Sequence, residues 1–532
     1  MMMPFTSLLE SLNSHVQEAR KIEHLIQYLE VASSEDASWA ISLLLGNQPK
    51  KVFDRKTLWA WTIEFTQYPT WLIEECCEVT NNITEALLLM IPQAEEAKLF
   101  TLTHLMNSIT DLQNLDHDRQ KIEVFQYWTV LDDEHQQLFT KVLLGQKVAK
   151  TPLKTISSAL AKKYDIRSTD IIYALSQKWS PKDVTIEELI SKGLDGSSFR
   201  SPYPFGLGAT LSDAPDDLGQ PGNWRMEWKW TGLRVQLVKR KGEIHIWSRE
   251  NLLNSFFPEF LEILDKVADD FVIDGQLSAL EGPSNQSEAV IERRLKRKFP
   301  GPKFRQRNPI MLIAYDILEK NKRDLRKIPL VERTDKLEEL VSAINVELPG
   351  MIFYSSEIDS DSWDALSVEH KRAREMNASG IVLKKKSGLY PTERQASNWI
   401  KWHMEPIEIM VTLLYVTRGT GIDSDSIDEF SLAVEGSQGQ YIPVARVKNN
   451  LKDDDLQFLK EYVHNESTER FGPVKAVHPG LMFKLSFDRL RPSKRHKSGI
   501  KLINIREIEL CEEHLLNQIT RLSELKALLG PN

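Results

Sequence analysis

Hydrophobic residues in the first third of the chain recur at the spacing of amphipathic helices. Between residues 7 and 189, apolar residues mostly lie three or four positions apart, as one face of an α-helix requires. Turn-forming segments such as 47–49 and 68–70 interrupt the pattern. The clearest runs cover residues 8–29, 39–45, 56–65, 83–89, 122–131 and 135–144. The pattern predicts an all-α domain over residues 1–195, with the apolar stripes as its core.

The hydrophobic pattern changes after Gly193. Residues 201–224 are rich in Pro, Gly and Asp, which is typical of a linker. Apolar or alternating runs at 235–238 and 244–247 flank a short polar turn and predict a β-hairpin. Further buried strands are predicted at 271–273, 311–315 and 381–383, and helices at 288–298 and 330–344. These elements predict an α+β domain over residues 196–405.

Short strands dominate the pattern from Ile407 onward. Strands are predicted at 409–416, 430–434, 441–447 and 480–487, with one helix at 453–464. About five short strands with an inserted helix favour a small β-barrel of the OB type. The tail from Glu507 to Leu529 is predicted to be an amphipathic helix. The third predicted domain covers residues 406–532, so the chain is predicted to be a multidomain protein.

Composition limits the classes of protein that fit this pattern. The 532 residues carry a formal net charge of −8, so nucleic-acid binding would have to come from local basic patches. The three cysteines, Cys76, Cys77 and Cys511, argue against a disulfide framework or a structural zinc site. They indicate a reducing, cytoplasmic compartment. No signal-peptide core and no run of ~20 apolar residues occurs, so no membrane segment is predicted.

Seven ordered segments carry a resemblance to a known family. The octet EWKWTGLR (227–234) is similar to the nucleotidyltransferase signature K-x-D-G-x-R. It is followed by WSRE (247–250), FPE (257–259), DGQL (274–277), AYDIL (314–318), SGIVLK (379–384) and WIKWH (399–403). With the helical segment before them and SKRHKSG (493–499) after them, nearly the whole chain resembles the bacterial ATP-dependent DNA ligases that carry an N-terminal helical DNA-binding domain. The resemblance implies a nucleotidyltransferase domain of the ATP-grasp-like ligase type.

Lys229 is the candidate nucleophile. A lysine amine can hold AMP as a phosphoramidate if its pKa falls from about 10.4 toward neutrality. Flanking by Trp228 and Trp230, with Arg234 five residues on, is expected to lower that pKa through burial and a nearby cation. The resemblance implies that Lys229 attacks the α-phosphate of ATP and that the AMP then passes to the 5′-phosphate of nicked duplex DNA.

The resemblance assigns roles to further residues. It implies that the Glu227 backbone faces the adenine and that Tyr315 stacks on it. Arg234 and Arg249 would contact the ribose or the nick phosphate, and Lys384 and Lys401 would lie near the α-phosphate. ATP and Mg²⁺ or Mn²⁺ are the implied cofactors, and a monomer is the implied state. DNA repair, recombination and replication are the implied pathways, with helicase and nuclease partners left open.

Four motif positions depart from the family pattern. Thr231, Gln276 and Ser379 stand where the family holds carboxylates, and His403 stands where it holds a second lysine. Because carboxylates hold Mg²⁺ in phosphoryl-transfer sites, the metal ligands stay unknown. Ile503 replaces an arginine of close relatives in a less secure alignment. Two hypotheses remain: a working ligase, or a catalytically impaired relative that acts as a DNA-binding or scaffold protein.

Basic clusters are the candidate DNA-binding surfaces. They are expected to contact the phosphate backbone without reading sequence. The residues are Arg293, Arg294, Arg297 and Lys298 in one cluster, and Lys494, Arg495 and Lys497 in another. Other classes fit less well: RNA ligases and capping enzymes usually lack the helical domain, and an NAD-dependent ligase should carry a cysteine zinc cluster. A scaffold protein without a nucleotide site stays open.

Overall fold

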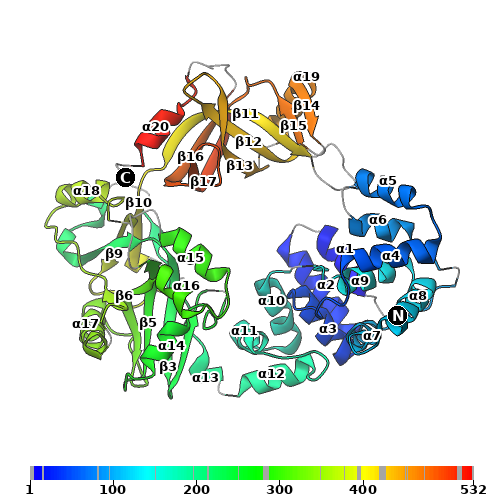
Figure 1. Ribbon diagram of the computed structural model, residues 1–532. Coiled ribbons are helices and arrows are strands. Elements are labelled where there is room, and N and C mark those ends of the chain that lie inside the picture. Colours follow the sequence, from blue (N-terminus) through cyan, green and yellow to red (C-terminus); the bar gives the residue numbers. More distant parts are fainter. Residues whose placement is uncertain are drawn as a thin grey trace. The chain divides into compact units, whose positions relative to one another are not determined.

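Figure 1 shows the ribbon of the computed structural model. The chain divides into two compact units. Met1–Pro202 and Val238–Asn254 make up the first unit, and Tyr203–Leu237 and Ser255–Asn532 the second. The structure describes residues 5–14, 17–80, 83–94, 96–149, 151–195, 197–211, 215–249, 251–279, 287–347, 349–376, 378–391, 397–418, 427–449, 451, 453–471, 474–511 and 518–529. The two units leave the predicted three-domain boundaries untested, so those boundaries stay a prediction.

Helices make up most of the first unit, as the apolar periodicity predicts. Their apolar stripes meet in one core that includes Trp128, Phe139 and Leu160, all fully buried. The helices are α1 (Phe5–Ser14), α2 (Glu18–Val31), α3 (Ser34–Leu44), α4 (Arg55–Thr66), α5 (Thr70–Thr80), α6 (Ile83–Met90), α7 (Leu102–Leu112), α8 (His117–Val130), α9 (Asp133–Leu143), α10 (Leu153–Tyr164), α11 (Ser168–Ser176), α12 (Ile186–Leu194) and α13 (Ser197–Arg200).

Side-chain caps explain where many of these helices begin. Ser33, Asp54, Asp116 and Asp132 each accept a hydrogen bond from a backbone N–H in the first turn of the following helix. Thr185 forms a reciprocal capping box with Glu188 at the start of α12. Each such cap accepts a hydrogen bond from a backbone N–H that has no partner within the helix. It contributes about 1 kcal/mol to the stability of the folded protein. No described helix combines the length and hydrophobicity that a membrane crossing requires.

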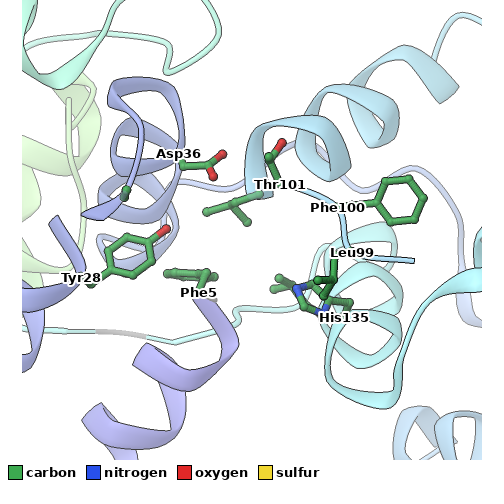
Figure 2. Close-up of a pocket in the computed structure, with 10 residues that line it drawn as sticks. Phe5, Tyr28, Asp36, Leu99, Phe100, Thr101 and His135 are labelled. Carbon is green, nitrogen blue, oxygen red and sulfur yellow. The ribbon is translucent and has the colours of Figure 1, made fainter. Parts of the chain in front are cut away.

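A small cavity of about 80 Å³ lies within the helical unit (Figure 2). Phe5, Tyr28 and His135 contribute to its lining. The buried Asp36 also lines it, and its Oδ1 accepts hydrogen bonds from the N–H and hydroxyl of Thr103, at 2.7 and 2.6 Å. Because that carboxylate oxygen already ties α3 to α7, we interpret the site as part of the helix packing.

Two sheets form the middle part of the chain. One has the order β1-β10-β9-β2, and the other β4-β3-β5-β6-β7 with β8 beside β6. The strands are β1 (Ala209–Thr210), β2 (Trp224–Trp230), β3 (Leu233–Arg240), β4 (Glu243–Trp247), β5 (Phe271–Ala279), β6 (Ile310–Lys320), β7 (Arg323–Asp324), β8 (Ile352–Tyr354), β9 (Ala378–Lys385) and β10 (Trp399–His403). The helices are α14 (Pro258–Leu264), α15 (Ser287–Leu295), α16 (Pro302–Arg307), α17 (Leu330–Glu347) and α18 (Trp363–Lys371).

The predicted strands of this region and the helix at 330–344 are confirmed, whereas the helix predicted at 288–298 is α15, which ends at Leu295. The hairpin of β3 and β4 turns through Lys241 and Gly242, whose φ angles of 53° and 77° suit a tight hairpin turn. β5 and β6 form a long antiparallel ladder in which Asp274 lies opposite Asp316. The pairing brings Asp274 close to Tyr315, the neighbour of Asp316 in β6.

The C-terminal part is rich in β-strands, as predicted. Its strands pair in the order β13-β12-β11-β15-β14, and β16 pairs with both β11 and β17. The elements are β11 (Ile407–Arg418), β12 (Ile427–Glu435), β13 (Tyr441–Lys448), α19 (Asp453–Glu466), β14 (Ser467–Phe471), β15 (Val474–Val477), β16 (Met482–Pro492), β17 (Ile500–Cys511) and α20 (Leu522–Ala527). The OB type of barrel stays a prediction.

The predicted C-terminal helix is wrong over its first part. Residues 507–511 belong to β17, which pairs with β16 from Pro492↔Ile500 to Met482↔Cys511. Only α20 is helical among the described residues of the tail. The long ladder with β16 satisfies the backbone groups of β17, so tertiary pairing overrides the weak helical periodicity.

Candidate active site

A cavity of about 170 Å³ lies among strands β2, β3, β5, β6, β9 and β10. A cavity of roughly 150 Å³ can hold a benzene ring, so there is room for an aromatic ring system here. The lining residues are Glu227, Trp228, Lys229, Trp230, Arg234, Gln276, Tyr315, Val382, Lys384, Trp399 and Lys401. Six of the seven residues that the sequence assigned to nucleotide chemistry therefore meet in one cavity.

Lys229 lies at an irregularity in the pairing of β2 with β9. The register shifts between Trp228, which pairs with Ile381, and Trp230, which pairs with Ala378. Such bulges redirect a side chain, and the Lys229 amine donates a hydrogen bond to the Ser379 hydroxyl at 2.6 Å. Burial, followed by the positive charge of Lys401, lowers the pKa of Lys229. Both effects favour the neutral amine, the form that can act as a nucleophile.

Two glycines allow strands to approach closely beside Lys229. Gly232 has a φ of +142°, and a Cβ there would lie 2.0 Å from the carbonyl oxygen of Leu277. Gly380 has a φ of +141°, and a Cβ there would lie 2.0 Å from the carbonyl oxygen of Trp402. No other residue fits either position without moving the backbone, so both glycines shape the cavity wall.

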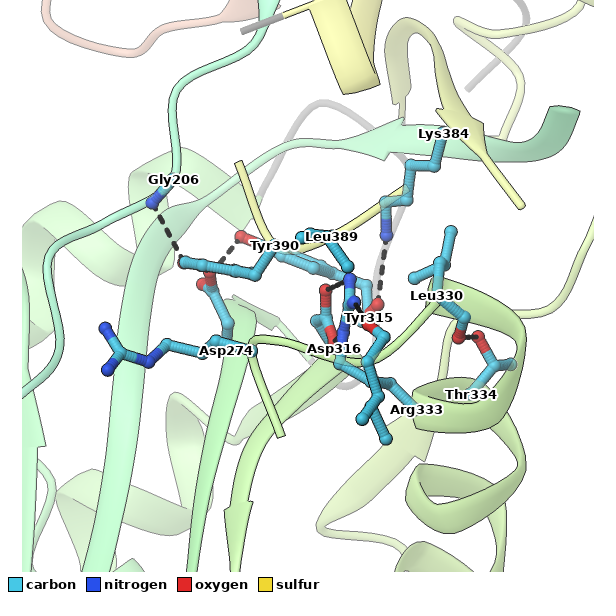
Figure 3. A network of polar contacts seen from close by, with 12 residues as sticks. Gly206, Asp274, Tyr315, Asp316, Leu330, Arg333, Thr334, Lys384, Leu389 and Tyr390 are labelled. Carbon is cyan, nitrogen blue, oxygen red and sulfur yellow. Dashed lines mark hydrogen bonds and ion pairs between the residues drawn. The ribbon is translucent and has the colours of Figure 1, made fainter. Parts of the chain in front are cut away.

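Lys384 is a buried cation at the centre of the cavity wall. Its amine donates to Glu227 Oε2 at 3.0 Å. It also donates to the Tyr315 carbonyl oxygen at 3.0 Å (Figure 3). It also lies 4.6 Å from the ring centre of Tyr315 and 4.9 Å from that of Trp399. Burial lowers the pKa of Lys384, and the charge of Glu227 opposes that shift. The two rings and Glu227 therefore hold Lys384 in place.

Arg225 holds the other oxygen of Glu227. Its Nε donates to Glu227 Oε1 at 2.8 Å, and its Nη2 donates to the Tyr354 hydroxyl at 2.6 Å. The carboxylate of Glu227 is thus shared by two buried cations. The sequence reading missed Arg225, although its position two residues before Glu227 on one strand places both side chains on the same face.

Asp274 anchors a second cluster next to the cavity. Its carboxylate accepts hydrogen bonds from Arg234 at 3.1 and 2.6 Å and from the Tyr315 hydroxyl at 3.1 Å. It also accepts one from the Tyr390 hydroxyl (Figure 3). Arg234 also donates to the Gly206 carbonyl at 2.6 Å. Burial raises the pKa of Tyr315, so its hydroxyl stays protonated as a donor. This cluster fixes the edge of the Tyr315 ring.

An ion pair between Asp316 and Arg333 lies on the other side of Tyr315 (Figure 3). Both side chains are fully buried, with Arg333 Nε at 2.7 Å from Oδ1 and Nη2 at 2.9 Å from Oδ2. Arg333 also donates to the Ile328 carbonyl at 2.6 Å. The pair joins helix α17 to strand β6 and so supports the strand that carries Tyr315.

The donor set does not fit a divalent cation. Glu227 is the one carboxylate among the described lining residues, and two cations already hold it. Asp274 is occupied by Arg234 and two tyrosines. The described part of the chain contains no group of three or more His, Cys, Asp or Glu side chains suited to a metal. Mg²⁺ prefers oxygen ligands, several of them charged, so the implied Mg²⁺ or Mn²⁺ has no residues here to hold it.

The four departing positions all lie at or near the cavity. Gln276 lines it, Ser379 accepts the hydrogen bond from Lys229, and Thr231 is buried. His403 pairs with Gly380 across β10 and β9. Burial, followed by the charge of Lys229, lowers the pKa of His403 to about 4, so this ring is neutral at pH 7.

His403 is expected to titrate near pH 4. In an NMR titration of ring-labelled histidine, its midpoint should lie well below the usual value of about 6.5. The substitution Lys229→Gln should raise that midpoint, because it removes the positive charge of Lys229, which lowers the pKa of His403. A midpoint that does not move would show that Lys229 and His403 do not interact.

Outside the cavity, the predicted contact residues have mixed outcomes. Arg249 is exposed and does not line the cavity. Arg294 is fully buried and donates to the carbonyls of Asn308 and Phe256 and to Glu259, so its prediction as a DNA contact is wrong. A guanidinium held by three internal acceptors cannot reach a phosphate. The other basic candidates are exposed: Arg293, Arg297, Lys298, Lys494, Arg495 and Lys497.

Comparison with known proteins places the cavity in a known domain. Residues 209–403 match the family described as ATP dependent DNA ligase domain. This segment of the chain is therefore similar to the ATP-dependent DNA ligase domain. The matched segment contains every described residue that lines the cavity.

The relatives align beyond the ligase domain. DNA ligase 2 of Methanosarcina acetivorans is 27% identical over 60% of this chain, and the chain spans only 57% of that protein. A DNA ligase of Methanococcus maripaludis is 23% identical over 79% of this chain and 77% of its own length. A solved mycobacterial DNA ligase D with ATP and MES matches 60% of this chain and 98% of its own at 17% identity, with a TM-score of 0.34. The two named relatives are archaeal, so they do not support the bacterial subgroup.

Proposed function

We propose that this protein is an ATP-dependent DNA ligase that seals nicks through a lysyl-AMP intermediate at Lys229. The observation that carries the proposal is an amine of lowered pKa, positioned in a cavity with an aromatic wall. Similarity to proteins named DNA ligase supports the reaction class. This similarity does not favour the alternative of a catalytically impaired DNA-binding or scaffold protein.

In the first step, the neutral amine of Lys229 attacks the α-phosphorus of ATP. A phosphorus–nitrogen bond forms, the bond to the bridging oxygen of the β-phosphate breaks, and pyrophosphate leaves. Tyr315 offers its ring to the adenine, and the Glu227 backbone faces the base edge. Lys384 and Lys401 offset the charge that develops on the phosphate oxygens. The lowered pKa of Lys229 supports this role, since an ammonium has no electron pair to donate.

In the later steps, the 5′-phosphate of a nick takes the AMP, and the 3′-hydroxyl then displaces it. The exposed basic residues Arg293, Arg297 and Lys298, and the cluster at 494–497, are proposed to contact the DNA backbone. Phosphate contacts release counterions, so the affinity for DNA should fall steeply with salt. Arg234 is held by Asp274 and Gly206, so we assign it to shaping the cavity wall beside the ribose.

The wider assignments rest on resemblance to the family. They are a helical DNA-binding domain at 1–195, an OB-fold domain at 406–532, a monomeric state and a cytoplasmic location. Arg249 is kept as a candidate contact to the nick phosphate, because its exposed side chain is accessible to a bound duplex. Repair, recombination and replication are the pathways in which nick sealing is needed.

Incubation with ATP labelled at the α-phosphate tests the proposal. The purified chain should acquire a covalent label that resists denaturation, and a nicked duplex should then discharge it with formation of a sealed strand. ATP labelled at the γ-phosphate is the control and should leave no label, because that phosphate departs with pyrophosphate. Failure to label or to seal, both in EDTA and with a divalent cation present, would contradict the ligase assignment.

A further inference from the structure

The charges around the cavity are strongly unequal. Besides the Lys229 amine, the lining holds three cationic side chains, Arg234, Lys384 and Lys401, and Glu227 is its one described carboxylate. Glu227 is neutralised by Arg225 at 2.8 Å and by Lys384 at 3.0 Å. The cavity therefore presents a surplus of positive charge to whatever enters it.

The neighbouring carboxylate of Asp274 offsets the charge of Arg234, but Lys401 and the pair of cations around Glu227 still leave a positive surplus. Asp274 is fully buried and bonded to Arg234 at 2.6 Å, and it accepts from Tyr315 and Tyr390 as well. Gln276 lines the cavity with a neutral amide, which adds no charge for a metal. A divalent cation would thus meet lysine amines and no uncommitted described carboxylate of the lining, and like charges at short range repel.

We propose that this cavity binds its adenine nucleotide free of any divalent cation. The inference rests on the proposed function, because it takes the ligand to be an adenine nucleotide. Direct pairing of the phosphates with lysine amines replaces the bridging that a metal ion would supply. A metal ion already bound to the phosphates competes with these lysines, because it withdraws negative charge from the oxygens that they contact.

Calorimetric titration with α,β-methylene ATP tests this inference, since the analogue cannot release pyrophosphate and no reaction interferes. The full chain is titrated in EDTA and again in saturating MgCl₂. We expect binding in EDTA, and affinity about tenfold lower with Mg²⁺, the effect of losing one hydrogen bond between charged groups. Binding that occurs only with Mg²⁺ would overturn the inference and leave the nucleotide site intact. Absence of binding in both buffers would overturn the inference and the proposed function together.

A single substitution provides an independent arm. Gln276→Glu places a carboxylate in the cavity wall with almost no change in shape, so binding should become stronger in Mg²⁺ than in EDTA. Gln438→Glu makes the same chemical change at an exposed position in the β12–β13 turn and should leave the preference for EDTA unchanged. If Gln276→Glu still binds the nucleotide more tightly in EDTA than in Mg²⁺, the lack of a cavity carboxylate does not cause this preference. The inference then fails.

Discussion

A chain that carries Lys229→Arg is expected to take up no α-phosphate label from ATP. A guanidinium keeps its proton at every accessible pH, so it has no electron pair with which to attack phosphorus. Arginine is similarly long and keeps N–H donors at this position, so the change removes the nucleophile with little change in side-chain size. Removal of a covalent nucleophile lowers turnover by up to about 10⁶-fold in a well-studied case, and labelling here should fall below detection.

The matched control for this experiment is Lys371→Arg. Lys371 is exposed at the end of α18, outside the cavity lining, so its exchange should leave labelling at the wild-type level. Wild-type labelling should also rise with pH toward the lowered pKa of Lys229, because deprotonation creates the reactive amine. Persistent labelling of Lys229→Arg would show that another residue accepts the AMP.

Asp316→Asn is expected to destabilise the protein by about 3–5 kcal/mol, because it leaves the buried Arg333 without its counter-charge. Both side chains are inaccessible to solvent, so water cannot compensate for the lost carboxylate. The free energy of unfolding of the second unit, followed by urea titration of the full chain, measures the effect. Asp359→Asn, an exposed site in the same unit, should change it by no more than about 0.5 kcal/mol.

The pair Asp316→Leu with Arg333→Met separates charge from packing. When both charges are replaced by apolar groups, much of the lost stability should return, since neither is then buried unpaired. If the double variant is as unstable as Asp316→Asn, packing at α17 rather than the ion pair accounts for the loss. If Asp316→Asn itself is as stable as the wild type, the pair makes no net contribution.

The sequence predicts elements well where a local period decides the structure. The helices of the first unit and strands such as β5, β6 and β9 are confirmed, because their apolar faces must be buried. The stretch that forms β17 misled the prediction, since its strand character depends on pairing with β16, which lies earlier in the chain. Pairing between separate segments leaves little trace in local periodicity.

The candidate site shows a similar division. Lys229, Tyr315, Lys384 and Lys401 were identified from motifs and meet in one cavity. The engagement of Glu227 by Arg225 was not foreseen, because hydrogen-bond partners depend on three-dimensional side-chain geometry. Burial of Arg294 was missed for the same reason: a basic cluster in sequence does not reveal which of its members points inward.

The contact between Lys384 and Glu227 has a consequence for how tightly any ligand can be held. The Lys384 amine is already paired with the Glu227 carboxylate, at 3.0 Å. If that contact breaks, Arg225 still stabilises the Glu227 carboxylate. Under the proposed function, ligand entry would exchange the Glu227 carboxylate for a phosphate at the Lys384 amine. The net binding free energy at this amine would be the difference between its contact with phosphate and its contact with Glu227. Because the two contacts are similar, that difference is small, and the product can leave as readily as the substrate binds.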